Sequence, residues 1–164
     1  MLRLPIVCVL AGVVSVLSGH QQNPTPAESD PVGNTLRATG LIHTDIGGFY
    51  KLRYDYSDTK RHQDSYIRKR VDTYESLSVQ ESYSLCYESK TAPDTELLRK
   101  VFQKSFSIGG LILEEPSKDQ ELWRIRFKID VPTNTTAERL KTYLQYVGGT
   151  ADGIEKELGA EDKL

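Results

Sequence analysis

The stretch Glu121-Leu-Trp-Arg-Ile-Arg-Phe-Lys-Ile-Asp-Val-Pro132 decides the fold of this chain. Its apolar side chains alternate strictly with charged ones, which is the period-two pattern of a strand with one face in the core and the other in water. The predicted inward residues are Trp123, Ile125, Phe127, Ile129 and Val131. Proline has no backbone N–H to donate, so we expect the strand to end at Pro132.

A long helix is predicted directly after this strand. Thr135-Thr136-Ala137-Glu138 has the pattern of a capping box, so we expect the helix to start near Thr136. An apolar stripe follows at steps of three and four residues: Leu140, Tyr143, Leu144, Val147, Ala151, Ile154 and Leu158. We expect this stripe to lie across the sheet. The pair Gly148-Gly149 predicts either a kink or a close approach of the helix to the sheet, and we favour the close approach.

The preceding sequence predicts further strands and a short helix. Residues 48–56 alternate as a strand with Tyr50, Leu52, Tyr54 and Tyr56 inward, and residues 57–60 form a turn. A second strand is predicted over 65–74, with Ile67 and Val71 inward. A third is predicted over 77–87, with Leu77, Val79, Tyr83, Leu85 and Tyr87 inward. A helix from about Asp94 to Gln103 and a strand over 106–113 lead to the stretch quoted above.

These patterns together predict an α+β fold. We expect an antiparallel five-stranded sheet in the order β-β-β-α-β-β-α, with the helices packed on one face. The form Ile-Gly-Gly-Leu, then Trp-Arg-Ile-Arg-Phe-Lys-Ile-Asp-Val-Pro, then Thr-Ala-Glu-Arg-Leu resembles the YbjN and type III secretion chaperone-like fold over about residues 48–158. The resemblance implies a small scaffold that binds partners or pairs with itself. Members of that group commonly begin with a helix, and residues 37–47 lack the pattern of one.

The N-terminus has the pattern of an export signal. A short positive segment with Arg3 precedes an apolar run from Ile6 to Leu17, so residues 1–18 are predicted to be a signal peptide cleaved after Ser18. The alternative is an uncleaved membrane anchor, although the run is shorter than a bilayer span requires. Residues 19–38 are polar and proline-rich, which predicts a flexible tether, and residues 39–160 are predicted to be a single α+β domain. No stable membrane span is expected after cleavage.

Composition and motifs exclude several kinds of function. A net charge of −2 and a pI near 5.9 argue against a nucleic-acid partner. The histidines His20, His43 and His62 have no ligand partner at metal-binding spacing, so neither a metal nor a cofactor is expected. After cleavage Cys86 would be the only cysteine, which is more typical of a bacterial exported protein. We interpret Cys86 as a partly buried strand residue, with an intermolecular disulfide as the second interpretation.

The outward face of the sheet is the candidate binding surface. Strand alternation places basic and aromatic side chains there, and guanidinium groups beside aromatic rings suit carboxylate, phosphate or protein recognition. The candidate residues are Arg53, Arg68, Arg70, Arg124, Arg126, Tyr66 and Tyr74. The alternative is an ordinary solvated face, whose basic residues pair across strands with Asp55, Asp72, Glu88 and Asp130.

The sequence therefore predicts an exported binding or interaction module, periplasmic or extracellular, with a protein partner or a homodimer as its expected association. No catalytic motif is present. The alternative is an enzyme whose site is built from residues without a motif. A deep pocket with convergent titratable groups would favour the enzyme, and a flat basic sheet would favour the module.

Overall fold

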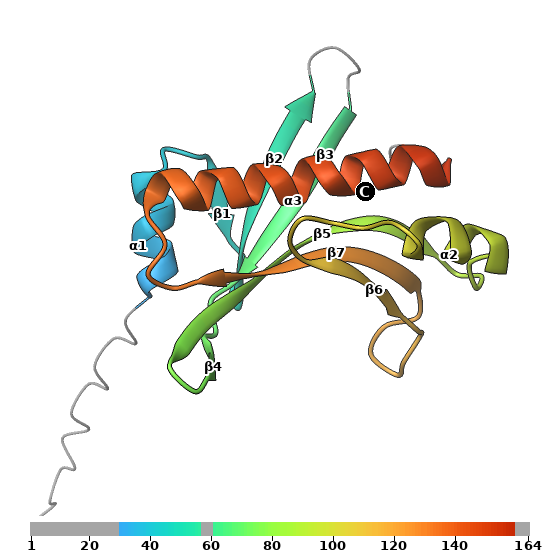
Figure 1. Cartoon of the computed structure of the whole chain (residues 1–164), viewed down its shortest axis with the longest axis horizontal. Coiled ribbons are helices and arrows are strands. Elements are labelled where there is room, and N and C mark those ends of the chain that lie inside the picture. Colours follow the sequence, from blue (N-terminus) through green and yellow to red (C-terminus); the bar gives the residue numbers. More distant parts are fainter. Residues whose placement is uncertain (1–29, 57–60, 160–164) are drawn as a thin grey trace, which may run out of the picture.

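One antiparallel sheet with a long helix across it makes up the body of the molecule (Figure 1). The structure is a computed structural model that describes residues 30–56 and 61–159. The strands lie in the order β1 (His43–Asp45), β2 (Phe49–Tyr56), β3 (Arg61–Arg68), β5 (Leu77–Ser89), β7 (Trp123–Pro132) and β6 (Gly110–Glu114), and β4 (Asp72–Tyr74) pairs with β5. The helices are α1 (Pro31–Ala38), α2 (Thr95–Phe102) and α3 (Ala137–Leu158). The predicted α+β class is confirmed.

The predicted number of five strands is wrong, because the sheet has seven strands in the described part of the chain. The two additional strands, β1 and β4, have three residues each, which is too short for alternation to show in the sequence. The second predicted strand is also displaced. It begins at Arg61 and ends at Arg68, and Val71, predicted to be inward, is 37% exposed. The predicted turn at residues 57–60 lies outside the described residues.

Helix α1 occupies part of the segment that was predicted to be a tether. The prediction is wrong for residues 31–38, where Asp30 caps the helix by accepting a hydrogen bond from the backbone of Gly33 at 2.8 Å. Val32 and Leu36 are buried in the main core, and α1 contacts α3. These two buried side chains hold α1 because they pack against a core that later elements of the chain form. The domain therefore includes α1, whereas residues 1–29 lie outside the described part of the chain.

Strand β7 has the predicted alternation and lies inside the sheet. Ile125, Phe127, Ile129 and Val131 are buried, and the residues between them point to the other face. Trp123, also predicted to be inward, is only half-buried and is not part of the core. β7 pairs with β5 on one side and with β6 on the other. The core is therefore built around the strand that the sequence marks most clearly.

Strand β5 has the opposite orientation from the predicted one. Ser82 and Ser84 are fully buried, whereas Tyr83 and Leu85 lie on the other face of the sheet. A bulge between Leu85 and Tyr87 then returns Tyr87 to the core side. The prediction failed because it assigned the larger apolar side chains to the core. The core-facing positions of β5 instead hold small side chains, because this face of the strand lies close to α3.

Helix α3 begins as predicted and approaches the sheet closely. Thr136 is the N-cap, and its hydroxyl accepts a hydrogen bond from the backbone of Arg139. A β-carbon at Gly148 would lie 3.0 Å from the Tyr54 ring and 3.1 Å from the Ser65 hydroxyl, whereas at Gly149 it would meet nothing within 4 Å. The predicted close packing is confirmed, and Gly148 is the residue that requires it.

Buried charges hold the C-terminal half of α3 to the sheet. Asp152 and Glu155 are buried on the helix, and Arg61 at the start of β3 binds both, at 3.0 and 2.8 Å. Lys156 adds a second ion pair to Asp152 at 2.7 Å. The sequence pattern did not reveal this cluster, because acidic residues on a helix are normally assigned to its solvated face. Among the residues that the structure describes, no helix is both long and apolar enough to span a bilayer.

Candidate interaction surface

The face of the sheet opposite α3, here called the outer face, is the surface with the most organised side chains. Strand register places alternate residues of β2, β3, β5, β7 and β6 on it. The described helices gather on the other side, since α1 contacts α3 and Lys104, just after α2, binds Glu157 of α3 at 2.6 Å. The outer face is thus left uncovered by helices in the described part of the chain.

An aromatic row crosses the centre of the outer face. The rings of Tyr66 and Tyr83 stack with centroids 5.0 Å apart and an interplanar angle of 16°. Phe49 meets Tyr83 edge-on at 5.8 Å. Adjacent strands β3 and β5 hold the two tyrosines directly opposite each other, so the stack follows from the strand register. We call these three residues the aromatic row.

Basic side chains lie over each ring of the aromatic row. The guanidinium of Arg126 is 4.4 Å from the centroid of Tyr83, and that of Arg68 is 5.7 Å from the centroid of Phe49. The ammonium of Lys51 is 5.9 Å from the centroid of Tyr66. Cations over aromatic faces are favourable, more so where the pair is partly desolvated. Burial also raises the pKa of the Tyr83 hydroxyl, although Arg126 opposes that shift, so the ring carries a neutral hydroxyl at physiological pH.

Acidic residues compensate the basic residues of the outer face. Asp64 binds Arg53 through two contacts of 2.9 and 3.0 Å and Lys51 through one of 2.6 Å. The remaining ion pairs of this kind join Arg124 to Glu88, Arg126 to Glu114 and Glu81, and Lys128 to Glu81 and Asp130. The face is therefore patterned with charge of both signs. The pairing of basic with acidic residues that the sequence left open as the alternative is thus observed, for example between Arg124 and Glu88 and between Lys128 and Asp130.

The pKa values of the paired groups reflect this arrangement. Burial raises the pKa of the Asp64 carboxyl, but the hydrogen bonds from Arg53 and Lys51 outweigh burial and lower it below its ordinary value of 3.8. For Lys128, burial lowers the pKa, and the hydrogen bond to Glu81 outweighs that effect and raises it. Both groups are thus charged at neutral pH, and the pattern of ion pairs is stable there.

The structure brings together most of the predicted binding residues, but not all of them. Arg53, Tyr66, Arg124 and Arg126 lie on the outer face, and Arg68 lies at its end beside Phe49. Arg70 and Tyr74 lie apart from the row. Arg70 follows the end of β3 and pairs with Asp72 at 2.8 Å, and Tyr74 is 61% exposed on the short strand β4.

Two central residues of the surface were missed by the sequence prediction. Tyr83 was assigned to the core because of the error in the orientation of β5. Phe49 lies within the strand predicted over residues 48–56, on its outward side, but it was not included among the candidate residues. A signal was available for Tyr83. Serine at 82 and 84 alternates with larger residues at 83 and 85, and small residues are expected on a face that a glycine-containing helix approaches closely.

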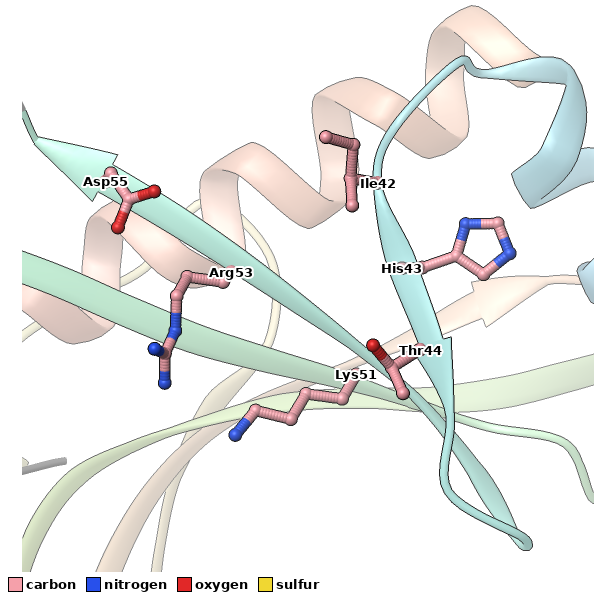
Figure 2. Close-up of a pocket in the computed structure, with 6 residues that line it drawn as sticks. All are labelled: Ile42, His43, Thr44, Lys51, Arg53 and Asp55. Carbon is pink, nitrogen blue, oxygen red and sulfur yellow. The ribbon is translucent and has the colours of Figure 1, made fainter.

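A hollow of about 580 Å³ lies beside the outer face, at the edge formed by β1 and β2. Figure 2 shows Lys51 and Arg53 extending from β2 on one side, with Thr44 of β1 beside them, while the ring of His43 points to the opposite side of β1. The His43 ring instead lies 2.9 Å from the carbonyl oxygen of Leu41. The titratable groups of the hollow therefore do not converge on one point, as the enzyme alternative would require.

Cys86 is not placed to act as a nucleophile, and no metal-ligand cluster is found among the described residues. Cys86 is fully buried, and burial raises the pKa of its thiol to about 12, so it is neither ionised nor accessible at neutral pH. An intermolecular disulfide through Cys86, the second interpretation of the sequence, is excluded in this fold by the same burial. Among residues 30–56 and 61–159 no three histidine, cysteine or acidic side chains are grouped to hold a metal ion.

No protein-family model, no curated protein and no solved structure matches the chain. The resemblance to the YbjN and type III secretion chaperone-like fold therefore stays a prediction.

Proposed function

We propose that this protein is an exported binding module that recognises another protein through the outer face of its sheet. The observation that carries the proposal is the aromatic row, held beneath Arg126 and Arg68 on a face that no described helix covers. Tyrosine and arginine are enriched in protein interfaces and account for many of their energetically dominant contacts. Export is supported by the apolar run after Arg3, and the helix α1 before the sheet supports the resemblance to the chaperone-like fold.

The chemistry of the surface favours a protein over an anionic polymer. Nucleic-acid binding depends on uncompensated basic charge, and here the basic residues already bind acidic neighbours. Arg68 differs from the others, since it shows no ion pair to another described residue. We expect the partner to place an apolar side chain against the aromatic row and a carboxylate against Arg68.

Site-specific photo-crosslinking in the native cell tests this proposal. A photoreactive residue at position 66 is expected to give a discrete protein adduct. The same residue at position 141, on the exposed side of α3, is expected to give none. Arg68→Glu should abolish the adduct formed from position 66, whereas Lys141→Glu should leave it intact. Equal adducts from both positions, or an adduct insensitive to Arg68→Glu, would place the interface elsewhere and overturn the proposal.

A further inference from the structure

The two edges of the sheet differ in how they are protected. At one edge, β1 has only the polar residues His43, Thr44 and Asp45. At the other, β6 presents Leu111, Ile112 and Leu113 between Gly110 and Glu114, and all five residues are half-exposed. Proteins normally blunt an edge strand with lysine, proline or a bulge, because unpaired backbone groups recruit other strands. β6 has none of these features, so its edge is open to pairing.

The side chains of β6 continue the two faces of the sheet. Leu111 and Leu113 lie opposite Phe127 and Ile125 and pack against the main core. On the outer face, Ile112 lies opposite Arg126. A strand added to this edge would therefore extend the core on the helix side and the interaction surface on the other. Such an added strand needs apolar side chains on the face toward α3 and, on the outer face, a side chain that packs beside Ile112.

The sequence of β6 meets these requirements for itself. When two copies pair antiparallel about Ile112, Ile112 lies opposite its own equivalent and Leu111 opposite Leu113 of the second copy. Gly110 then lies opposite Glu114 of the second copy. This register is symmetric, as a two-fold dimer interface requires. On the helix side it places Ile125, Leu113, Leu111 and Phe127 in one apolar row across the two copies, the last two from the second copy.

Charge complementarity supports the same register. Gly110 lies between Lys128 of its own copy and Glu114 of the second copy. These two residues are two strands apart, or roughly 10 Å between backbones, and glycine leaves the space between them free of a side chain. Their long side chains can therefore approach each other and join the ion pairs that Lys128 already makes with Glu81 and that Glu114 already makes with Arg126, and the symmetric contact lies on the other side of the axis. A hollow of about 440 Å³ lined by Gly109, Lys128 and Ile129 leaves room beside the end of β6 for the start of the second copy's β6–β7 connection.

We infer that β6 is the dimer interface of this protein, and that two copies join edge to edge about Ile112 into one continuous sheet. Both α3 helices then lie on the same side. Both aromatic rows lie on the other side, so the dimer presents two equivalent binding surfaces on one face. The pairing satisfies the open backbone groups of β6 and buries its leucines.

Sedimentation of the full chain in mild detergent tests the dimer. Wild type is expected to sediment as a dimer, and Ile112→Lys as a monomer or a dimer weakened by about tenfold or more, because two lysines would face each other at the axis and apolar burial would be lost. Thr44→Lys, on the outer face at the opposite edge, is the matched control and should remain dimeric. A monomeric wild type, or a dimer that Ile112→Lys leaves unchanged, would overturn the inference.

A covalent trap tests the register without adding charge. Residues directly opposite each other in paired strands have β-carbons about 4.5–5.5 Å apart, close enough for a disulfide after a small adjustment. In a Cys8→Ser chain, Ile112→Cys should form a covalent dimer on mild oxidation, and Thr44→Cys should not. Cys86 is buried and does not interfere. Equal cross-linking from positions 112 and 44, or none from 112, would contradict pairing about Ile112.

Discussion

Gly148 shows how one missing side chain sets the distance between α3 and the sheet. A β-carbon at this position would come closer to Tyr54 of β2 and to Ser65 of β3 than an ordinary β-carbon contact allows. The neighbouring Gly149 faces open space and is exposed. Two adjacent glycines with the same helix propensity therefore have different roles, and only the packing distinguishes them.

We expect Gly148→Val to lower the free energy of unfolding by about 1–3 kcal/mol, because the added methyl groups overpack the contact with Tyr54. The matched variant Gly149→Val should lie within about 0.5 kcal/mol of wild type, since valine is at least as good a helix former as glycine. Urea denaturation followed by circular dichroism measures both. Similar losses for the two variants would show that the close approach has been placed at the wrong residue.

Because of Asp64, we expect the free energy of unfolding to fall as the solution becomes acidic. Its pKa is lowered in the folded chain, so its ion pairs with Arg53 and Lys51 stabilise the fold above the ordinary carboxyl pKa. That stabilisation is lost as the pH falls through the lowered value. We expect the unfolding free energy to decrease below about pH 4 and the Asp64→Asn variant to show a shallower decrease.

Thermal melts from neutral to acid pH measure this dependence. Asp55→Asn provides the control, because Asp55 is exposed on the same β2–β3 hairpin and shows no ion pair to another described residue. Its profile should follow that of wild type. If Asp64→Asn also retained the wild-type acid slope, the ion pairs of Asp64 would not contribute to stability.

At the scale of elements, the contact between α3 and the β2–β3 hairpin depends on charge as well as on apolar packing. The first half of α3 presents leucine and valine to the core, whereas its last turns present Asp152 and Glu155 to Arg61. Buried carboxylates require a partner, because the loss of solvation is not otherwise compensated. Arg61 therefore connects the end of the helix to the start of β3.

Replacing Arg61 by methionine should destabilise the fold by about 3–5 kcal/mol, because it removes the guanidinium from two buried carboxylates while keeping a side chain of similar length. Lys156→Met removes the ion pair that the partly exposed Lys156 makes with Asp152. This change should lower the free energy of unfolding by at most about 1 kcal/mol. Chemical denaturation of the two variants measures the difference. Comparable values would mean that solvent screens the Arg61 contacts.

At the scale of the whole molecule, the proposed export determines where the binding surface acts. The segment before Asp30 contains an apolar run that is shorter than a bilayer span and is followed by polar residues. We expect the mature chain to start at Gly19 or within a few residues of it. Intact-mass measurement of the released protein identifies the terminus, and a full-length chain held in the membrane fraction would contradict cleavage.

The sequence by itself determined the elements whose pattern is long and strict. Alternation over Trp123–Val131 and the apolar stripe of α3 are local periodicities, so β7, α3 and the α+β class were predicted correctly. The cap at Thr136 was predicted for the same reason, since capping depends on neighbouring residues. On the outer face, alternation correctly assigned Arg53, Tyr66, Arg124 and Arg126.

Only the tertiary structure decided the remaining features, because they depend on residues that are distant in sequence. Serine at 82 and 84 faces the core because α3 lies close above it, and this moves Tyr83 to the outer face. Helix α1 is stable because Leu36 meets a core formed by later elements. The positive charge of Arg126 on the outer face is compensated because Glu81 and Glu114 lie on the two strands that flank β7. Strand pairing and helix packing bring these residues together, and no local pattern in the sequence records which segments will meet.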